Sequence, residues 1–123
     1  MGDSREKQME EMLKELRAES AGVEGAVLIS SDAMPLASDL SNGLEEEVLS
    51  AMASALIAAG ERVAKDLSRG DVEHLYLRGG DGDLVVARVN DDAVLACVVD
   101  HQAKMGITLL EVNRCAQRLS DVI

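Results

Sequence analysis

Residues 72–99 read VEHLYLRGGDGDLVVARVNDDAVLACVV, and this stretch decides the fold. Short apolar or alternating runs are separated by turn-forming residues, a pattern typical of strands joined by tight turns. The predicted strands are residues 72–78, 84–89 and 93–99. Asp81-Gly82, between the first two, is a strong hairpin signal. The third run is apolar throughout, so we expect it to be central in the sheet and covered on both faces.

Two more strands are expected upstream, at residues 25–30 and 34–38. Pro35 lies in the second of them and cannot donate to a sheet ladder, so this strand belongs at an edge. Because the short turn at Asp32 and Ala33 separates the two runs, we expect them to form a hairpin.

Three helices complete the chain. The first ends before Gly22 and the last begins between Lys104 and Thr108, and both carry apolar residues at helical spacing. The longest spans about residues 44–68, with acids in its first turn and basic residues towards its end, the order that the helix dipole favours. We therefore expect one domain, residues 1–123, in the order αββαβββα. Because the links between strands are short, the fold class is α/β (α+β), with a five-stranded antiparallel sheet and helices on both faces.

The long helix indicates a partner. Residues 51–60 are apolar or small on almost every side, whereas a helix lying once against a sheet needs only one apolar stripe. The second face would be bare in a monomer, and its small residues would let a symmetric partner approach closely. The alternative is a helix buried within its own monomer, but a chain of this length leaves little to cover it.

The strand at 72–78 is a second candidate for self-association. We expect it at an edge of the sheet, where pairing with its own copy would continue the sheet across a homodimer. The residues expected at the dimer or partner interface are Met52, Ala55, Leu56, Ala59, Val63, Val72, His74 and Tyr76.

Composition excludes several classes of function. The net charge is −11, from 12 basic and 23 acidic residues, which repels nucleic-acid phosphates and anionic lipids. Aromatic residues make up 1% of the chain, and Tyr76 alone offers no platform for stacking bases. No apolar run approaches membrane-spanning length, and the charged residues 1–7 do not resemble a signal peptide. We expect neither a nucleic-acid partner nor membrane insertion.

The two cysteines indicate a reducing compartment. Cys97 lies in the apolar run 93–99 and Cys115 on the last predicted helix, and together they have no metal-binding spacing. We expect both to be buried, reduced thiols, since free cysteine packs as a small hydrophobe. A cytoplasmic protein is therefore expected.

No residue pattern predicts catalysis. The glycines of 79–82 lack the Gly-Lys-Ser/Thr sequence and the following helix of a phosphate loop. His101 follows Asp100, but adjacent residues in an extended segment point to opposite faces, so we expect no dyad. We therefore expect a protein that is not an enzyme, with no catalytic, cofactor-binding or metal-binding residues.

Residues 22–38, GVEGAVLISSDAMPLAS, resemble the opening hairpin of roadblock/dynein-light-chain domains. The long Ala-rich helix, the Arg-Gly-X-Asp-Gly region at 78–82 and the Leu-Leu-Glu of 109–111 follow in the family's order. The resemblance covers about residues 13–122. Ala33 stands where the family usually has glycine, and because alanine resists positive φ, the turn type there stays open.

The resemblance implies a profilin-like architecture, with one long helix on one face of the sheet and two helices on the other. Family members dimerise through the long helix and the middle edge strand. Prokaryotic members partner small Ras-like GTPases, and eukaryotic members serve as dynein subunits or scaffolds. We therefore expect a non-catalytic homodimer that binds and regulates a small Ras-like GTPase. The alternative is a structural adaptor that tethers partners without altering nucleotide turnover.

Several arginines remain as candidates for an arginine finger supplied in trans to a GTPase. They are Arg62, Arg69, Arg78, Arg88, Arg114 and Arg118. The acidic composition favours the other interpretation, in which each of them forms a surface ion pair.

Overall fold

The computed structural model describes residues 2–123, with side chains from Ser4 onward. The elements are α1 (Gly2–Glu19), β1 (Val23–Ser30), β2 (Pro35–Leu40), α2 (Glu46–Asp66), β3 (His74–Arg78), β4 (Asp83–Asn90), β5 (Ala93–Val99) and α3 (Met105–Ser120). This is the predicted order, αββαβββα, and β5 has the predicted bounds. The long helix is shorter than expected at both ends.

The strands form one sheet in the order β2-β1-β5-β4-β3. Every neighbouring pair is antiparallel, as the short links between the strands predict. β5 is central, in agreement with its apolar sequence, and β2 and β3 form the two edges. Pro35 therefore lies on an edge strand, where its missing N–H costs no ladder bond.

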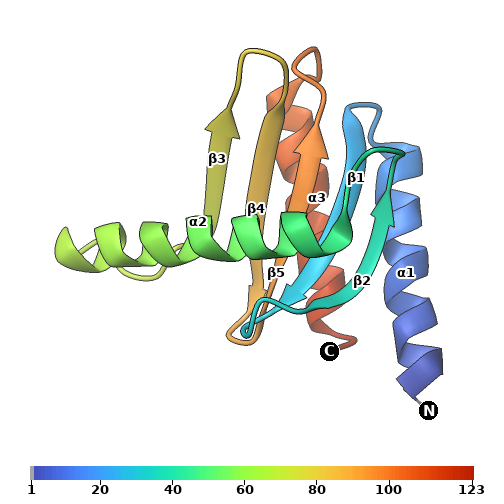
Figure 1. The fold of residues 1–123 in the computed structure, drawn as a ribbon, viewed down its shortest axis with the longest axis horizontal. Coiled ribbons are helices and arrows are strands. Elements are labelled where there is room, and N and C mark those ends of the chain that lie inside the picture. Colours follow the sequence, from blue (N-terminus) through green and yellow to red (C-terminus); the bar gives the residue numbers. More distant parts are fainter. Residues whose placement is uncertain (1) are drawn as a thin grey trace.

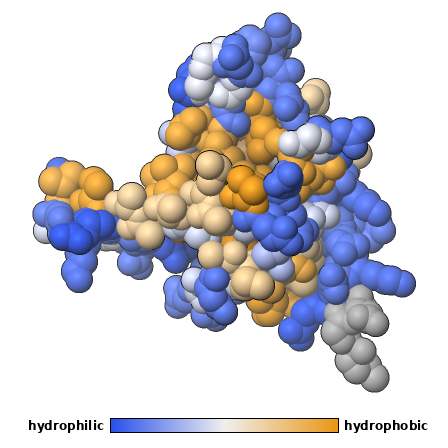
Figure 2. Space-filling model, in the orientation of Figure 1, coloured by the Kyte–Doolittle hydropathy of each residue, from blue (hydrophilic) through white to orange (hydrophobic). Residues whose placement is uncertain are grey.

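The helices cover the two faces of the sheet unequally (Figure 1). α1 and α3 lie behind the sheet in this view, and α2 crosses its front. Side chains alternate between the faces, so Leu28 and Leu95 pack towards α1 and α3, whereas Val27 and Ala96 pack towards α2. The predicted arrangement, one long helix against two, is confirmed. The space-filling view shows apolar surface along α2 and on the sheet above it (Figure 2).

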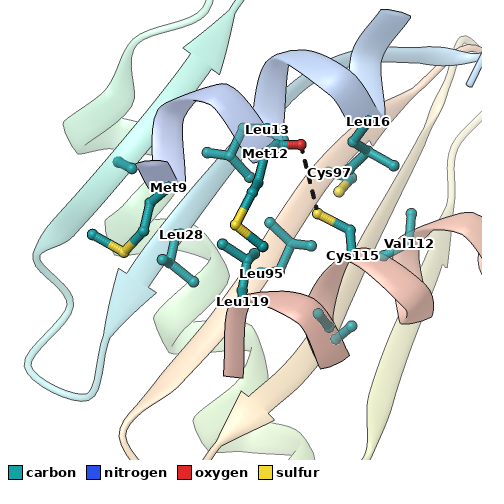
Figure 3. Packing of buried hydrophobic residues seen from close by; sticks show 14 of the residues in the cluster. Met9, Met12, Leu13, Leu16, Leu28, Leu95, Cys97, Val112, Cys115 and Leu119 are labelled. Carbon is teal, nitrogen blue, oxygen red and sulfur yellow. Dashed lines mark hydrogen bonds between the residues drawn. The ribbon is translucent and has the colours of Figure 1, made fainter. Parts of the chain in front are cut away.

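The larger core lies between the sheet and the α1/α3 layer (Figure 3). Cys97 and Cys115 are both free and buried in this core, as the sequence predicts. The Cys115 thiol donates a weak hydrogen bond to the Met12 carbonyl, with 3.9 Å between Sγ and oxygen. Burial raises the pKa of Cys97, and it raises the pKa of Cys115 to about 11. Both thiols are therefore protonated at neutral pH.

The turn between β1 and β2 has a glycine-like conformation without glycine. Ala33 has a φ of 66°, in the left-handed region. The N–H of Ala33 donates to the Ser30 carbonyl at 3.0 Å, and the N–H of Met34 donates to the Ser30 hydroxyl at 3.2 Å. These bonds hold alanine in a conformation that costs an L-residue about 1–2 kcal/mol. The turn that the sequence left open therefore places Ala33 in the left-handed region, where an alanine is strained.

Two features hold the far end of α2. Ser68 has a φ of 55°, and the N–H of Arg69 donates to the Ala64 carbonyl at 2.7 Å, which closes the helix in the manner of a Schellman motif. Arg88 of β4 donates from Nε to the Val72 carbonyl, in the loop between α2 and β3, at 2.8 Å, and its guanidinium pairs with Glu61 of α2. The last turns of α2 project past β3 (Figure 1), so no sheet of this chain lies beneath them.

Candidate functional site

One side of α2 carries apolar residues that the chain itself leaves uncovered. They recur at intervals of three and four, which places them in one line along the helix. We call them the helix stripe: Val48, Met52, Ala55, Ala59 and Val63. The side chain of Met52 is 65% exposed and that of Val63 is 57% exposed. The opposite side of the helix packs on the sheet through Ala53 and its neighbours.

A bare part of the sheet lies beside the helix stripe. Leu77, Leu84 and Val98 occupy matching positions on β3, β4 and β5, on the face that α2 crosses. Leu77 is 47% exposed, and the other two side chains are half-buried. We call these three residues the sheet shelf. In Figure 2 the apolar surface over these strands continues onto α2.

The helix stripe and the sheet shelf together form one apolar surface, which we call the apolar corner. The other flank of α2, with Ser54, Ala58 and Glu61, faces the β1–β2 and β4–β5 turns across a groove of about 390 Å³. The sheet shelf lies at the opposite ends of β4 and β5 from their connecting turn. The stripe and the shelf therefore lie on the same side of α2, where one partner would cover both.

The structure brings four of the eight expected interface residues together on one side of α2. Met52, Ala55, Ala59 and Val63 belong to the helix stripe. Leu56 is half-buried against the cluster beneath α2. The expectation for Val72 is corrected: it precedes β3 and is only 9% exposed, because the bend before the strand directs it into the chain.

Sequence reasoning missed the sheet shelf. The signal was present in the alternation of β3, which places Leu77 on the same face as Leu75. Leu75 is covered because it packs against the cluster beneath α2, and Leu77 is exposed because it lies farther along the strand. Only the path of α2 across the sheet tells the two apart.

β3 presents a free edge. Backbone hydrogen bonds join Glu73 to Arg88 and Gly79 to Gly82, each at 2.8 Å. Bonding alternates along an antiparallel ladder, so the odd-numbered residues from 73 to 79 bond to β4. The even-numbered residues direct their N–H and C=O groups away from the sheet. They are His74, Tyr76 and Arg78.

Tyr76 links the edge strand to a buried carboxylate. Its hydroxyl donates to Asp83 Oδ2 at 2.9 Å, and Arg78 Nη1 donates to the same hydroxyl at 3.4 Å. Asp83 is buried, and its Oδ1 has no hydrogen-bond partner within the described chain. Partial burial and the bond to Asp83 raise the pKa of Tyr76, so the hydroxyl stays a donor at neutral pH.

Asp100 and His101 contact one another, contrary to the sequence expectation. His101 Nδ1 lies 3.4 Å from Asp100 Oδ1, because both residues lie in the turn after β5 and not in an extended strand. Each side chain is about half exposed. The contact is a surface pair, and an imidazole charge there is largely screened by water.

The candidate arginines differ in their partners. Ion pairs or hydrogen bonds to side chains hold four of them: Arg62, Arg78, Arg88 and Arg118. Arg69, just beyond α2, and Arg114, on α3, are exposed and form no ion pair among the described side chains. Arg78 also forms no ion pair there, since its partner is the Tyr76 hydroxyl. The preferred interpretation, a surface ion pair for each arginine, therefore does not hold for Arg69, Arg78 and Arg114.

The described residues contain neither a metal-ligand cluster nor a helix suited to cross a membrane. No group of three His, Cys, Asp or Glu side chains within residues 4–123 is arranged to hold a metal ion. None of the helices in this part of the chain has the length and hydropathy that a membrane crossing requires.

These features define a class of protein: a small α+β domain with an exposed apolar helix face and a free sheet edge. The chain belongs to the Roadblock/LC7 domain family, whose model matches residues 9–99, from α1 to the end of β5. An uncharacterized protein of Methanocaldococcus jannaschii, MJ1340, is 26% identical over 98 residues, which cover 80% of this chain and 85% of that protein.

Solved structures share the fold. The gliding protein MglB from Thermus thermophilus superposes with a TM-score of 0.86 at 22% identity, over 96% of this chain and 90% of that one. An MglB in a tetrameric arrangement gives a TM-score of 0.87 at 23% identity, over 96% and 89% of the two chains. Profilin II of Acanthamoeba castellanii gives 0.65 at 14% identity, over 89% and 94%, in line with the expected profilin-like architecture.

Proposed function

We propose that the protein is a non-catalytic homodimer that binds and regulates a small Ras-like GTPase in the cytoplasm. The observation that carries the proposal is the exposed apolar corner of helix stripe and sheet shelf, next to the free edge of β3. An apolar surface of this kind on a small protein marks an interaction site. Family membership, and the resemblance to members that partner GTPases, support the same conclusion.

A second copy of the chain fits the corner. α2 has Glu46 and Glu47 in its first turn and Lys65 in its last, so antiparallel packing of two α2 helices is favoured over parallel packing. The small side chains of Ala55 and Ala59 let two such helices approach closely. A two-fold axis beside β3 would set the partner's α2 over the sheet shelf and the two β3 edges against each other. The tetrameric arrangement of one MglB supports self-association of this fold.

Regulation would follow from differential binding. The outer side of the paired α2 helices would present exposed residues, among them Glu47, Ala51 and Arg62, to the switch region of the GTPase. A regulator that binds one nucleotide-dependent conformation more tightly than the other shifts the population towards it. This mechanism needs no catalytic residue in the regulator.

Nucleotide turnover by a small Ras-like GTPase from the same organism tests the proposal. GTP hydrolysis and nucleotide exchange are measured at a fixed GTPase concentration while this protein is titrated to excess. We expect a complex on gel filtration and a hydrolysis or exchange rate that changes until the GTPase is saturated. No complex together with unchanged rates would contradict the proposal.

The structural adaptor is the alternative, and the same titration separates the two. An adaptor forms the complex and leaves both rates unchanged. Where the hydrolysis rate rises, Arg69→Ala and Arg114→Ala test an arginine finger. Loss of a finger lowers the stimulated rate by roughly 10³-fold or more, whereas a population shift tolerates either change.

A further inference from the structure

The free edge of β3 determines how two copies would pair, and the inference drawn from it rests on the proposed homodimer. The outward N–H and C=O groups belong to His74, Tyr76 and Arg78. In a two-fold antiparallel pair, only the register centred on Tyr76 lets all three residues bond to the partner at once. Each facing pair of this kind exchanges two backbone bonds, so the register forms roughly six. Any shift along the edge leaves some of these groups unpaired.

We call the line along which the two β3 strands pair the seam. This register places His74 of one copy opposite Arg78 of the other, once at each end of the seam. Residues facing each other in such a pair have Cα atoms about 5.5 Å apart and side chains on the same face of the sheet. That face is the one covered by α1 and α3, because Tyr76 pairs with Val85, a member of their core cluster. The side chains of these facing residues therefore lie on the face of the sheet opposite to α2.

His74 already borders a groove on that face. The groove measures about 390 Å³ and lies between β3 and α3, where it is lined by His74, Asn113 and Gln117 among others. In the register centred on Tyr76, the partner's copy of Arg78 reaches the same groove across the seam. A protonated His74 directly opposite a guanidinium in the neighbouring strand would destabilise the pairing unless a negative charge lies between them.

We propose that each pair of His74 and the partner copy's Arg78 binds an anionic oxygen group, a carboxylate or a phosphate. The guanidinium supplies a fork of N–H donors that matches either group, and the imidazole supplies one more. The side-chain amides of Asn113 and Gln117 add neutral donors from α3. The site is incomplete in one copy and arises only when two copies pair.

The charged groups around the site make it most positive when His74 is protonated. Glu73 and Arg88 line the same groove, and Arg88 is engaged by Glu61. The acid beside Arg78 is Asp83, which is buried and accepts from Tyr76. α3 contributes only uncharged residues to the groove. Because a protonated imidazole adds one positive charge to the site, we expect stronger anion binding at acid pH than at alkaline pH.

The dissociation constant of the dimer tests the site. It is measured by sedimentation of the whole chain in sodium phosphate, sodium acetate or sodium chloride at equal ionic strength, near pH 6 and near pH 8. We expect phosphate or acetate to lower the constant roughly tenfold relative to chloride near pH 6, and less near pH 8. A response to phosphate alone assigns the site to phosphate groups, and a response to acetate assigns it to carboxylates.

Matched variants separate this site from general effects of salt. His74→Gln and Arg78→Gln should remain dimeric and lose the response, whereas Arg114→Gln, an exposed arginine elsewhere on α3, should keep it. The site is overturned by a dimer that forms in chloride but responds to neither anion, or by an equal loss of response in all three variants. A monomer in every buffer overturns the proposed homodimer, and the site with it.

Discussion

On the α1/α3 face of the sheet two helices cover the strands, whereas on the α2 face a single helix leaves part of the sheet bare. Leu28, Leu95 and Leu119 on the first face are fully buried, and Met52 and Leu77 on the second are largely exposed. The same strands supply both faces by alternation, so the difference comes from the helices. The α1/α3 face therefore stabilises the chain by itself, whereas the α2 face leaves apolar surface exposed.

The largest expected effect on stability comes from the α1/α3 face, which two helices cover. Leu95→Ala removes a fully buried side chain between β5 and the two helices, and the cavity should lower the free energy of unfolding by roughly 3–5 kcal/mol. Urea unfolding at one fixed protein concentration measures the change. The control is Leu110→Ala on the exposed side of α3, which should change it by less than about 0.5 kcal/mol. Similar losses in both variants would remove the contrast.

The next largest effect is expected on the α2 face, from a change that disrupts the proposed dimer. Ala59→Glu places a charge in the middle of the helix stripe, so the dissociation constant of the dimer should rise by roughly a hundredfold or more. Light scattering measures the mass, and circular dichroism checks that the helices remain. Ala58→Glu, on the flank of α2 that faces the turns, is the matched control and should leave the dimer intact. A dimer that tolerates Ala59→Glu would place the interface elsewhere.

A smaller effect tests how well the α1/α3 layer excludes solvent from the two cysteine thiols. Burial raises the pKa of Cys115 to about 11 and that of Cys97 as well, so the thiols of the unfolded chain ionise first as the pH rises. The contribution of each protonated thiol to the free energy of unfolding is therefore present in full below about pH 8.5. Between pH 8 and pH 10 each thiol should lower the free energy of unfolding by roughly 1.5–2 kcal/mol.

Unfolding free energies at pH 8 and pH 10 measure this slope. Cys115→Ala should reduce it by the contribution of one thiol, whatever the variant does to stability at pH 8. A slope that does not change in this variant would show that Cys115 is open to solvent in the folded chain.

The smallest effect concerns the strained turn of an edge strand. Ala33 has a φ of 66°, so Ala33→Gly relieves about 1–2 kcal/mol of strain and returns part of it as entropy of the unfolded chain. The net gain in the free energy of unfolding should be roughly 0.5–1 kcal/mol, measured by urea unfolding. A loss of stability in this variant would mean that the turn carries no strain.

The residues whose patterns depend on near neighbours could be predicted from the sequence. The apolar run 93–99 indicated the central strand, Pro35 indicated an edge, and the small residues of 51–60 indicated a helix with two apolar sides. Each pattern follows from burial or backbone chemistry within one element. The helix stripe could be predicted for the same reason, since its spacing is a property of one helix.

The remaining features depend on how elements meet, which periodicity does not contain. Val72 was expected at the dimer or partner interface, but a bend before β3 buries it within its own chain. Asp100 and His101 were expected to point apart, but they lie in a turn that begins where β5 ends. Leu77 and Leu75 have equivalent places in the alternation, and only the path of α2 across the sheet covers one and exposes the other.

We propose that the α2 face is an interface between two copies of the chain. The molar mass of the unmodified protein, measured by light scattering over a range of concentrations, tests this interface most directly. We expect about twice the chain mass of 13.1 kDa. A mass equal to that of the single chain at every concentration would contradict it.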